Sequence, residues 1–289
     1  MISGFTFLRN AVKYDYPFQE AIKSVLPLCD EFVVAVGNSE DSTREAVMKI
    51  DPGKIRIIDT VWDESPGMKI GGRVFAQETD KAFRAISPES YWAFYIQGDE
   101  VMHEKYLEPV RSAMNRWKDE KTVDGLLFNY LHFYGSYDYV GTSPRWYDNE
   151  IRIIRNNPSI YSYRDAQGFR KGDDQKLNVK QTDAWIYHYG WVKNPRVMAD
   201  KIRNATNFYL DNKWIRSQAL EDEYDFSAID SLRLFDESHH ALMEERIKRV
   251  NWKFDHDLSM NRISARYKAK IFLKKYLGIN TFYENYILV

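Results

Sequence analysis

The sequence contains little cysteine and no long hydrophobic run. Its single cysteine, Cys29, cannot form an internal disulfide or a thiolate metal cluster, and this fits a reducing compartment. The longest apolar runs, such as the one at 91–96, are far shorter than the roughly 20 residues of a membrane-spanning helix. We therefore expect a cytoplasmic protein.

The sequence also lacks a net charge, with 41 basic and 42 acidic residues. This balance gives no overall attraction for nucleic acid, so no such partner is expected. The exception is the stretch 262–275, where six basic residues and no acids alternate with apolar residues. It predicts either a peripheral contact of 262–277 with the inner membrane face or a terminal helix whose apolar side packs on the core.

Short apolar runs alternate with segments of helical periodicity in the first half of the chain. The runs at 2–8, 32–36, 55–58 and 91–96 are typical of strands, and amphipathic helical patterns lie between them. This order predicts an α/β protein with a mostly parallel sheet flanked by helices. Beyond residue 195 the pattern becomes helical, so we expect a core at 1–195 and a helical C-terminal extension, 196–289, packed on it.

The last of these apolar runs leads directly into "QGDE", which ends in two acids, Asp99 and Glu100. Ligands of parallel α/β sheets bind outside the carboxyl ends of the strands, and Asp99 follows such an end. Carboxylates at that edge suit a divalent cation. The alternative is that both acids begin a helix, where they interact favourably with its dipole.

Three stretches resemble bacterial family 2 glycosyltransferases, which have the GT-A (Rossmann-like) fold. They are "EFVVAVGNSEDSTREA", "FYIQGDEVM" and "IYHYGWVKNPRVMADK", and the resemblance covers residues 2 to about 201. It implies transfer of a sugar from a nucleotide-diphosphate donor to an acceptor hydroxyl of a glycan or lipid-linked glycoconjugate. It also implies Mn²⁺ or Mg²⁺ as a cofactor and a role in polysaccharide biosynthesis.

The resemblance assigns the metal to Asp99 and His188, with Asp99 also on the donor side. For His188 the alternative is a hydrogen-bonded core histidine. Gln97 stands where the family commonly has the first aspartate of its DxD motif, and it is kept as a donor-side residue. Val36 and Gly37 lie where the family often has acids that bind the nucleobase of the donor. The sequence therefore does not identify which nucleotide binds.

Two further residues are donor-side candidates. Asn38 could donate or accept hydrogen bonds, or simply form an Asx-type turn. Arg73 follows Gly71 and Gly72 at the start of an expected helix, where backbone amides and a guanidinium both favour anions. The alternative for this segment is a flexible turn with a solvated cation.

An inverting transfer needs a general base, and the family pattern points to Asp165 as the catalytic residue. Asp173 and Asp174 are its rivals, although they look more like a polar turn. The structural alternative for Asp165 is an ion pair with Arg164 or Arg170.

The stretch 128–147 carries eight aromatic residues, which suit the faces of sugar rings. We expect Tyr137 and Trp146, with Glu100, on the acceptor side, and a structural role for His132. Two other functions stay open. A nucleotidyltransferase is disfavoured because no glycine-rich triphosphate loop with a paired lysine is present. A catalytically degenerate nucleotide- or glycan-binding protein is supported by Gln97.

Overall fold

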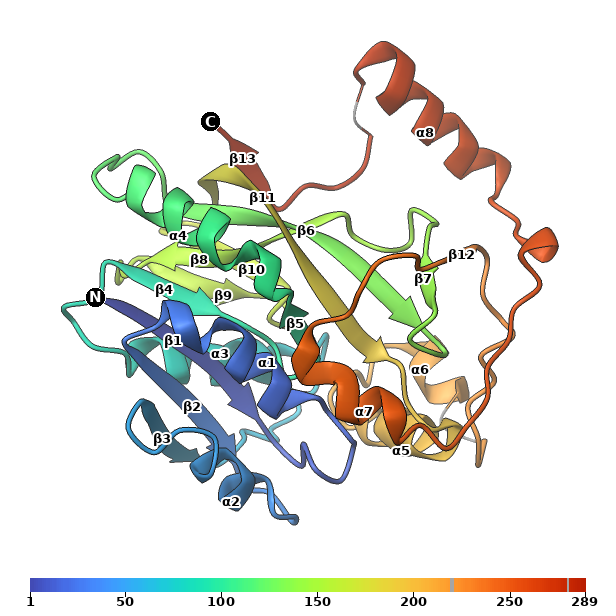
Figure 1. Cartoon of the computed structure of the whole chain (residues 1–289), viewed down its shortest axis with the longest axis horizontal. Coiled ribbons are helices and arrows are strands. Elements are labelled where there is room, and N and C mark those ends of the chain that lie inside the picture. The colour runs from blue at the N-terminus through green and yellow to red at the C-terminus, as the bar shows by residue number, and fades with distance from the viewer. Residues whose placement is uncertain (219–220, 280) are drawn as a thin grey trace.

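The computed structural model describes residues 1–218, 221–279 and 281–289. Its first half alternates strands with helices, as the sequence predicts (Figure 1). The elements are β1 (Ile2–Leu8), α1 (Phe18–Val25), β2 (Glu31–Gly37), α2 (Thr43–Met48), β3 (Ile55–Thr60), α3 (Arg73–Arg84) and β4 (Trp92–Tyr95). All four strands expected from the apolar runs are therefore confirmed.

These four strands form one parallel block in the order β3-β2-β1-β4. Strand β2 is buried on both faces, because Phe32, Val34 and Val36 join one core cluster while Val33 and Ala35 join the other. Helix α1 packs on the first face and α3 on the second. Successive side chains of a strand point to opposite faces, so a continuous apolar run fits a sheet covered on both sides.

The second half of the sheet does not follow the expected parallel pattern. Its elements are β5 (Glu100–Met102), α4 (Leu107–Arg116), β6 (Gly125–Tyr134), β7 (Tyr139–Gly141), β8 (Asn149–Arg155), β9 (Ile160–Tyr163), β10 (Gly168–Lys171) and β11 (Gln175–Trp191). Strand β8 runs antiparallel to both β4 and β6, and β9, β10 and β11 form antiparallel pairs. The prediction of a mostly parallel sheet was therefore wrong.

The sheet is mixed, in the order β3-β2-β1-β4-β8-β6-β11-β10-β9. The physical reason lies in the connections. A parallel neighbour needs a long crossover, usually a helix, whereas short turns join antiparallel neighbours. No helix separates β6 from β11 along the described chain, so most neighbours in this half are antiparallel.

A buried ion pair joins the two halves beneath the strand ends. The guanidinium of Arg152, on β8, binds both carboxylate oxygens of Glu100 at 2.8 and 2.7 Å, and Tyr130 donates a hydrogen bond at 2.9 Å. Both charged side chains are almost completely buried. A buried charge is tolerated only when it is paired and hydrogen-bonded, and here both conditions hold.

The remaining elements are α5 (Pro195–Ala205), α6 (Lys213–Gln218), β12 (Leu232–Leu234), α7 (Glu244–Lys248), α8 (Ala265–Leu277) and β13 (Tyr286–Leu288). Strand β13 pairs with β11 of the main sheet. The division into a core at 1–195 and an extension at 196–289 stays a prediction. No helix of the described chain is long and apolar enough to cross a membrane.

Candidate active site

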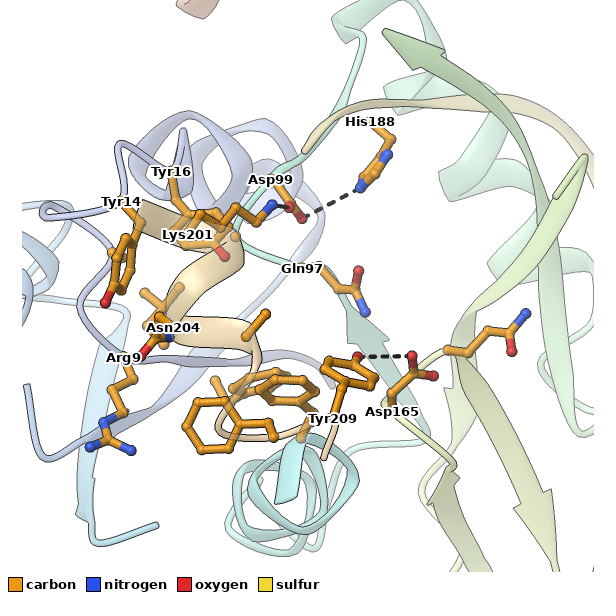
Figure 2. Close-up of a pocket in the computed structure, with 18 of the residues that line it drawn as sticks. Arg9, Tyr14, Tyr16, Gln97, Asp99, Asp165, His188, Lys201, Asn204 and Tyr209 are labelled. Atoms are coloured by element: carbon orange, nitrogen blue, oxygen red, sulfur yellow. Dashed lines mark hydrogen bonds and ion pairs between the residues drawn. The ribbon is translucent and has the colours of Figure 1, made fainter. Parts of the chain in front are cut away.

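A cavity of about 550 Å³ lies at the carboxyl ends of β1 and β4 (Figure 2). Its walls also come from the turn between β9 and β10, from the end of β11 and from α5 with the residues that follow it. The charged and polar side chains that line it include Arg9, Gln97, Asp99, Asp165, His188 and Lys201. The cavity therefore lies at the edge where ligands of α/β sheets bind.

Asp99 lies at the inner wall, directly after Gly98. A Cβ at Gly98 would lie 2.8 Å from Leu8 Cδ2, so any other residue there would require the Leu8 side chain to shift. Burial alone raises the pKa of Asp99, but neighbouring positive charge, chiefly the ammonium group of Lys201, outweighs it and leaves the pKa below its usual value. Asp99 is therefore a carboxylate.

The imidazole of His188 is oriented by a second histidine. His132 Nε2 lies 2.9 Å from the carbonyl oxygen of Tyr147, which can only accept, so this nitrogen carries the proton. Burial holds the pKa of His132 well below its usual range, so the ring is neutral and its Nδ1 is an acceptor. His188 Nδ1 lies 3.1 Å from His132 Nδ1 and must be the donor.

This hydrogen bond determines what His188 presents to the cavity. Burial also lowers the pKa of His188 and outweighs the opposing effect of Asp99, so the ring is neutral. Its Nε2 therefore carries a free lone pair, 3.8 Å from Asp99 Oδ1 (Figure 2). Two electron-pair donors that face each other repel unless a cation lies between them.

The pair fits a divalent cation. Metal ligands of this kind lie about 2.1 Å from the ion, so two atoms 3.8 Å apart can bind the same ion. In the part of the chain that the structure describes, no set of three His, Cys, Asp or Glu side chains could hold a metal. A cation bound here would thus have two ligands from the described part of the chain, and substrate and water would supply the others.

Lys201, which was not expected in the site, holds the other oxygen of Asp99. Its Nζ lies 3.4 Å from Asp99 Oδ2 and donates a hydrogen bond to the carbonyl of Gly190 at 2.9 Å. A Cβ at Gly190 would lie 2.6 Å from His188 Nε2 and 2.8 Å from Asp99 Oδ2. Glycine therefore keeps the space between His188 and Asp99 open.

Asp165 lies at the tip of the turn that joins β9 to β10. Its neighbours Arg164 and Ala166 have φ of 56° and 64°, a left-handed conformation that costs energy in residues other than glycine. Tyr209 donates a hydrogen bond to Asp165 Oδ2 at 3.0 Å. A strained turn thus directs one carboxylate into the cavity. Tyr209 was not anticipated, since no local pattern marks it.

The rival acids lie elsewhere. Asp173 and Asp174 are exposed in the turn at the opposite end of β10, and Asp174 pairs with Arg170 at 3.4 Å. They do not line the cavity. Of the three acids, only Asp165 lies in the same cavity as Asp99.

Gln97 connects the β4 end to the turn that carries Asp165. Its side-chain amide donates a hydrogen bond to the carbonyl of Ala166 at 3.1 Å and lies 3.3 Å from the hydroxyl of Tyr95. A carboxylate could not donate to that carbonyl. This contact gives a physical reason for glutamine at the position where the glycosyltransferases that the sequence resembles commonly have an aspartate.

The far end of the cavity is aromatic and cationic. The guanidinium of Arg9 lies over the Trp62 ring, 5.0 Å from its centroid, and Phe208 packs against Trp62. Arg9 Nε and Trp62 Nε1 are buried without a hydrogen-bond partner among the described residues. A Cβ at Gly37 would lie 2.3 Å from Trp62 Nε1. Trp62 therefore fills the space where the glycosyltransferases that the sequence resembles often have acids that bind the nucleobase.

The other predicted residues lie outside this cavity. Asn38 is exposed, and its side-chain oxygen accepts from the backbone amide of Trp62 at 3.4 Å. Arg73 is exposed at the start of α3. Tyr137 is buried in a cluster with Tyr189, and the Glu100 carboxylate is taken up by the ion pair described above. None of these four lines the cavity.

Trp146 lines a second cavity, of about 760 Å³, on the other side of Tyr147 and Gln167. Both of these residues line the two cavities, which are therefore neighbours. The second cavity is walled by the segments 142–150 and 282–286 and by three residues of α8. Ser143 Oγ, Glu150 Oε2 and Asn285 Nδ2 belong to these walls and have no hydrogen-bond partner in the described part of the chain.

No family model and no curated protein matches this chain. Among solved structures, TarS from S. aureus is similar over 78% of this chain and 44% of its own, at 17% identity and a TM-score of 0.40. Glucosyl-3-phosphoglycerate synthase from Mycobacterium tuberculosis, in complex with Mn²⁺ and UDP, is similar over 47% and 45%, at 16% identity and a TM-score of 0.30. This chain thus spans less than half the length of either.

A third solved structure, 4-diphosphocytidyl-2C-methyl-D-erythritol synthase from Anaerococcus prevotii, is similar over 67% of this chain and 91% of its own. The identity is 12% and the TM-score is 0.38. Scores and identities at this level assign no substrate and no activity. The function must therefore be argued from the site itself.

Proposed function

We propose that the protein is a glycosyltransferase that moves a sugar from a nucleotide-diphosphate donor to an acceptor hydroxyl, with inversion at the anomeric carbon. One observation carries the proposal: a single cavity combines the Asp99 and His188 pair on one wall with Asp165 on another. The first pair suits the leaving diphosphate, and the separate carboxylate suits proton removal from the acceptor.

The diphosphate end of the donor is assigned to Asp99 and His188. Mn²⁺ or Mg²⁺ bound there would neutralise the charge that develops on the leaving diphosphate. Lys201 adds a fixed positive charge beside Asp99. This end of the cavity therefore favours an anionic leaving group.

The nucleoside is assigned to the end formed by Arg9 and Trp62. Flat aromatic and guanidinium surfaces suit a nucleobase or ribose. Recognition would thus depend on stacking and on a cation rather than on carboxylates. Recognition without carboxylates fits the uncharged residues Val36 and Gly37 at the end of β2.

Asp165 is assigned as the general base. It accepts the proton of the acceptor hydroxyl while that oxygen bonds to the anomeric carbon and the bond from this carbon to the diphosphate oxygen breaks. The hydrogen bond from Tyr209 holds one carboxylate oxygen, and Gln97 holds the turn that carries the residue. Both contacts limit the motion of the base, as efficient proton transfer requires.

The acceptor is assigned to the second cavity, which reaches the first at Tyr147 and Gln167. Its walls combine aromatic rings, Trp146 among them, with buried polar atoms on Ser143 and Asn285 that lack partners in the described chain. Ring faces together with hydrogen-bonding groups suit a sugar. We therefore propose a glycan or lipid-linked acceptor, and a cytoplasmic enzyme of polysaccharide biosynthesis.

The test is nucleotide release from a panel of sugar nucleotides in the presence of Mn²⁺, with and without added glycans. We expect at least one sugar nucleotide to release its nucleoside diphosphate, faster when an acceptor is present. Binding of a nucleotide without any release would instead favour a degenerate binding protein. Release of inorganic pyrophosphate from a nucleoside triphosphate would favour a nucleotidyltransferase.

A further inference from the structure

Helix α8 contributes almost nothing to the core of the protein. The structure describes all thirteen of its residues, and none of them is buried. Figure 1 shows the helix at the edge of the molecule, apart from the sheet, with non-helical chain leading to and from it. The expected alternative, a terminal helix that packs its apolar side on the core, does not describe this arrangement.

The inner side of α8 has polar attachments. Lys274 forms an ion pair with Asp148 at 3.2 Å, and Lys270 donates a hydrogen bond to the carbonyl of Thr281 at 3.3 Å. Ile271 faces the second cavity, which it lines with Lys274. These contacts set which side of the helix faces solvent.

The outer side carries large apolar residues. Phe272 and Tyr276, one helical turn apart, stack with ring centroids 5.0 Å apart and are 54% and 64% exposed. At the C-terminal end of the helix and just after it, Leu277 is 58% exposed and Ile279 is 52% exposed. Exposed apolar residues gathered in this way mark an interaction surface more often than single ones do.

Basic residues border this apolar strip. Lys268 and Lys275 lie four residues before and three residues after Phe272, so both neighbour it on the helix surface. No acid occurs between Arg262 and Tyr283. Without the six basic residues of 262–275, the chain has 35 basic and 42 acidic residues. Five of these six basic residues lie on α8 and Arg262 lies just before it, while the rest of the chain has an excess of acids.

We propose that α8 binds the surface of an anionic lipid bilayer, with Phe272 and Tyr276 in the headgroup region and the flanking lysines beside lipid phosphates. Basic residues supply long-range attraction, and apolar residues on the same face supply shallow insertion. An exposed aromatic pair adds to binding at a lipid interface but little to the phosphate contacts that hold duplex nucleic acid. The inference does not depend on the proposed enzymatic activity.

Membrane contact would also orient the second cavity. Ile271, Lys274 and Lys275 line that cavity, so its wall on the α8 side would lie at the lipid surface. An acceptor held in the membrane could then reach the cavity without leaving the bilayer. This consequence, unlike the contact itself, rests on the proposed function.

The experiment is vesicle co-sedimentation of the full-length protein at low and high salt. Vesicles contain phosphatidylcholine alone or phosphatidylcholine mixed with phosphatidylglycerol. One variant combines Lys268→Glu with Lys275→Glu, and another combines Phe272→Ser with Tyr276→Ser. Because the four substituted side chains are exposed, both variants should fold, which circular dichroism and thermal unfolding verify.

The matched controls make the same kinds of change elsewhere on the exposed surface: Lys49→Glu with Lys121→Glu, and Met48→Ser. We expect wild type and controls to bind only the phosphatidylglycerol vesicles, more weakly at high salt, and each α8 variant to bind at least tenfold less. Failure of the wild type to bind at low salt would overturn the proposal. So would unchanged binding by the lysine variant, or a loss in the lysine variant without a loss in the aromatic variant.

Discussion

His132 and His188 face each other through their Nδ1 atoms, 3.1 Å apart, and this hydrogen bond turns the free lone pair of His188 towards Asp99. His132 lies between the backbone carbonyl of Tyr147 and the proposed ligand, so it acts through His188 rather than on a substrate. Residues that orient a metal-binding histidine in this way commonly govern metal affinity.

The first prediction concerns this orientation. His132→Phe keeps a ring among the neighbouring aromatic side chains but removes the acceptor for His188. We expect the Mn²⁺-dependent affinity for a nucleoside diphosphate to fall by about 10- to 100-fold, with metal-free binding unchanged. Calorimetry with Mn²⁺ and with chelator measures both. His103→Phe, a buried histidine outside the cavity, is the control; equal losses in both variants would mean that His132 has only a packing role.

The second prediction concerns the base. Asp165→Asn removes the proton acceptor but can still accept the hydrogen bond from Tyr209. We expect turnover to fall by about 100-fold or more with little change in donor affinity. Steady-state kinetics of nucleotide release provide both values, and Asp173→Asn is the matched control. If Asp173→Asn lost activity while Asp165→Asn kept it, the base would lie in the turn after β10.

The third prediction concerns the buried ion pair. Arg152→Met leaves the Glu100 carboxylate buried without its partner, so we expect the free energy of unfolding to fall by about 3–5 kcal/mol. Arg196→Met breaks an exposed pair with Glu223 and should lower the free energy of unfolding far less, because solvent screens an exposed pair. Urea unfolding compares the two. Similar losses would show that burial of the pair has no special importance.

The fourth prediction is a pH dependence of stability. Burial raises the pKa of the Glu150 carboxyl from its ordinary value of 4.5 to about 8, against the opposing effects of Arg152 and Gln167. The folded protein therefore keeps a proton that the unfolded chain releases, so the free energy of unfolding falls as pH rises between these two values.

The contribution of Glu150 to this slope is at most about 1.4 kcal/mol per pH unit. Urea unfolding across this pH range should show a flatter profile for Glu150→Gln than for the wild type. Profiles of equal slope would mean that Glu150 is ionised in the folded protein.

Much of the parallel half of the fold could be predicted from sequence because its signals are local. The run at 91–96 predicts β4, and the topology of such sheets then brings Asp99 to the ligand edge. The mixed half could not be predicted in the same way. Its pairings, such as β8 between β4 and β6, depend on tertiary contacts. We expected parallel strands there too, although the alternation of strands and helices that predicts a parallel sheet lies in the first half of the chain.

The site was predictable to a similar extent. The motif pattern suggested Asp99, His188 and Asp165, which the fold gathers in one cavity. Lys201 and Tyr209 lie on α5 and just after it, where the sequence shows only an amphipathic helix, and they reach the site because α5 packs beside the strand ends. A local pattern carries no information about such a contact.

The most direct test of the proposed donor site is calorimetric titration of a panel of nucleoside diphosphates into wild type and Asp99→Asn, with Mn²⁺ and with chelator. Asp99→Asn keeps the shape of the side chain but removes the charge that faces His188 and Lys201. We expect at least one nucleoside diphosphate to bind wild type more tightly with Mn²⁺, and this enhancement to disappear in the variant while the fold stays intact. An enhancement of equal size in Asp99→Asn, or no binding of any nucleoside diphosphate to wild type, would contradict the account.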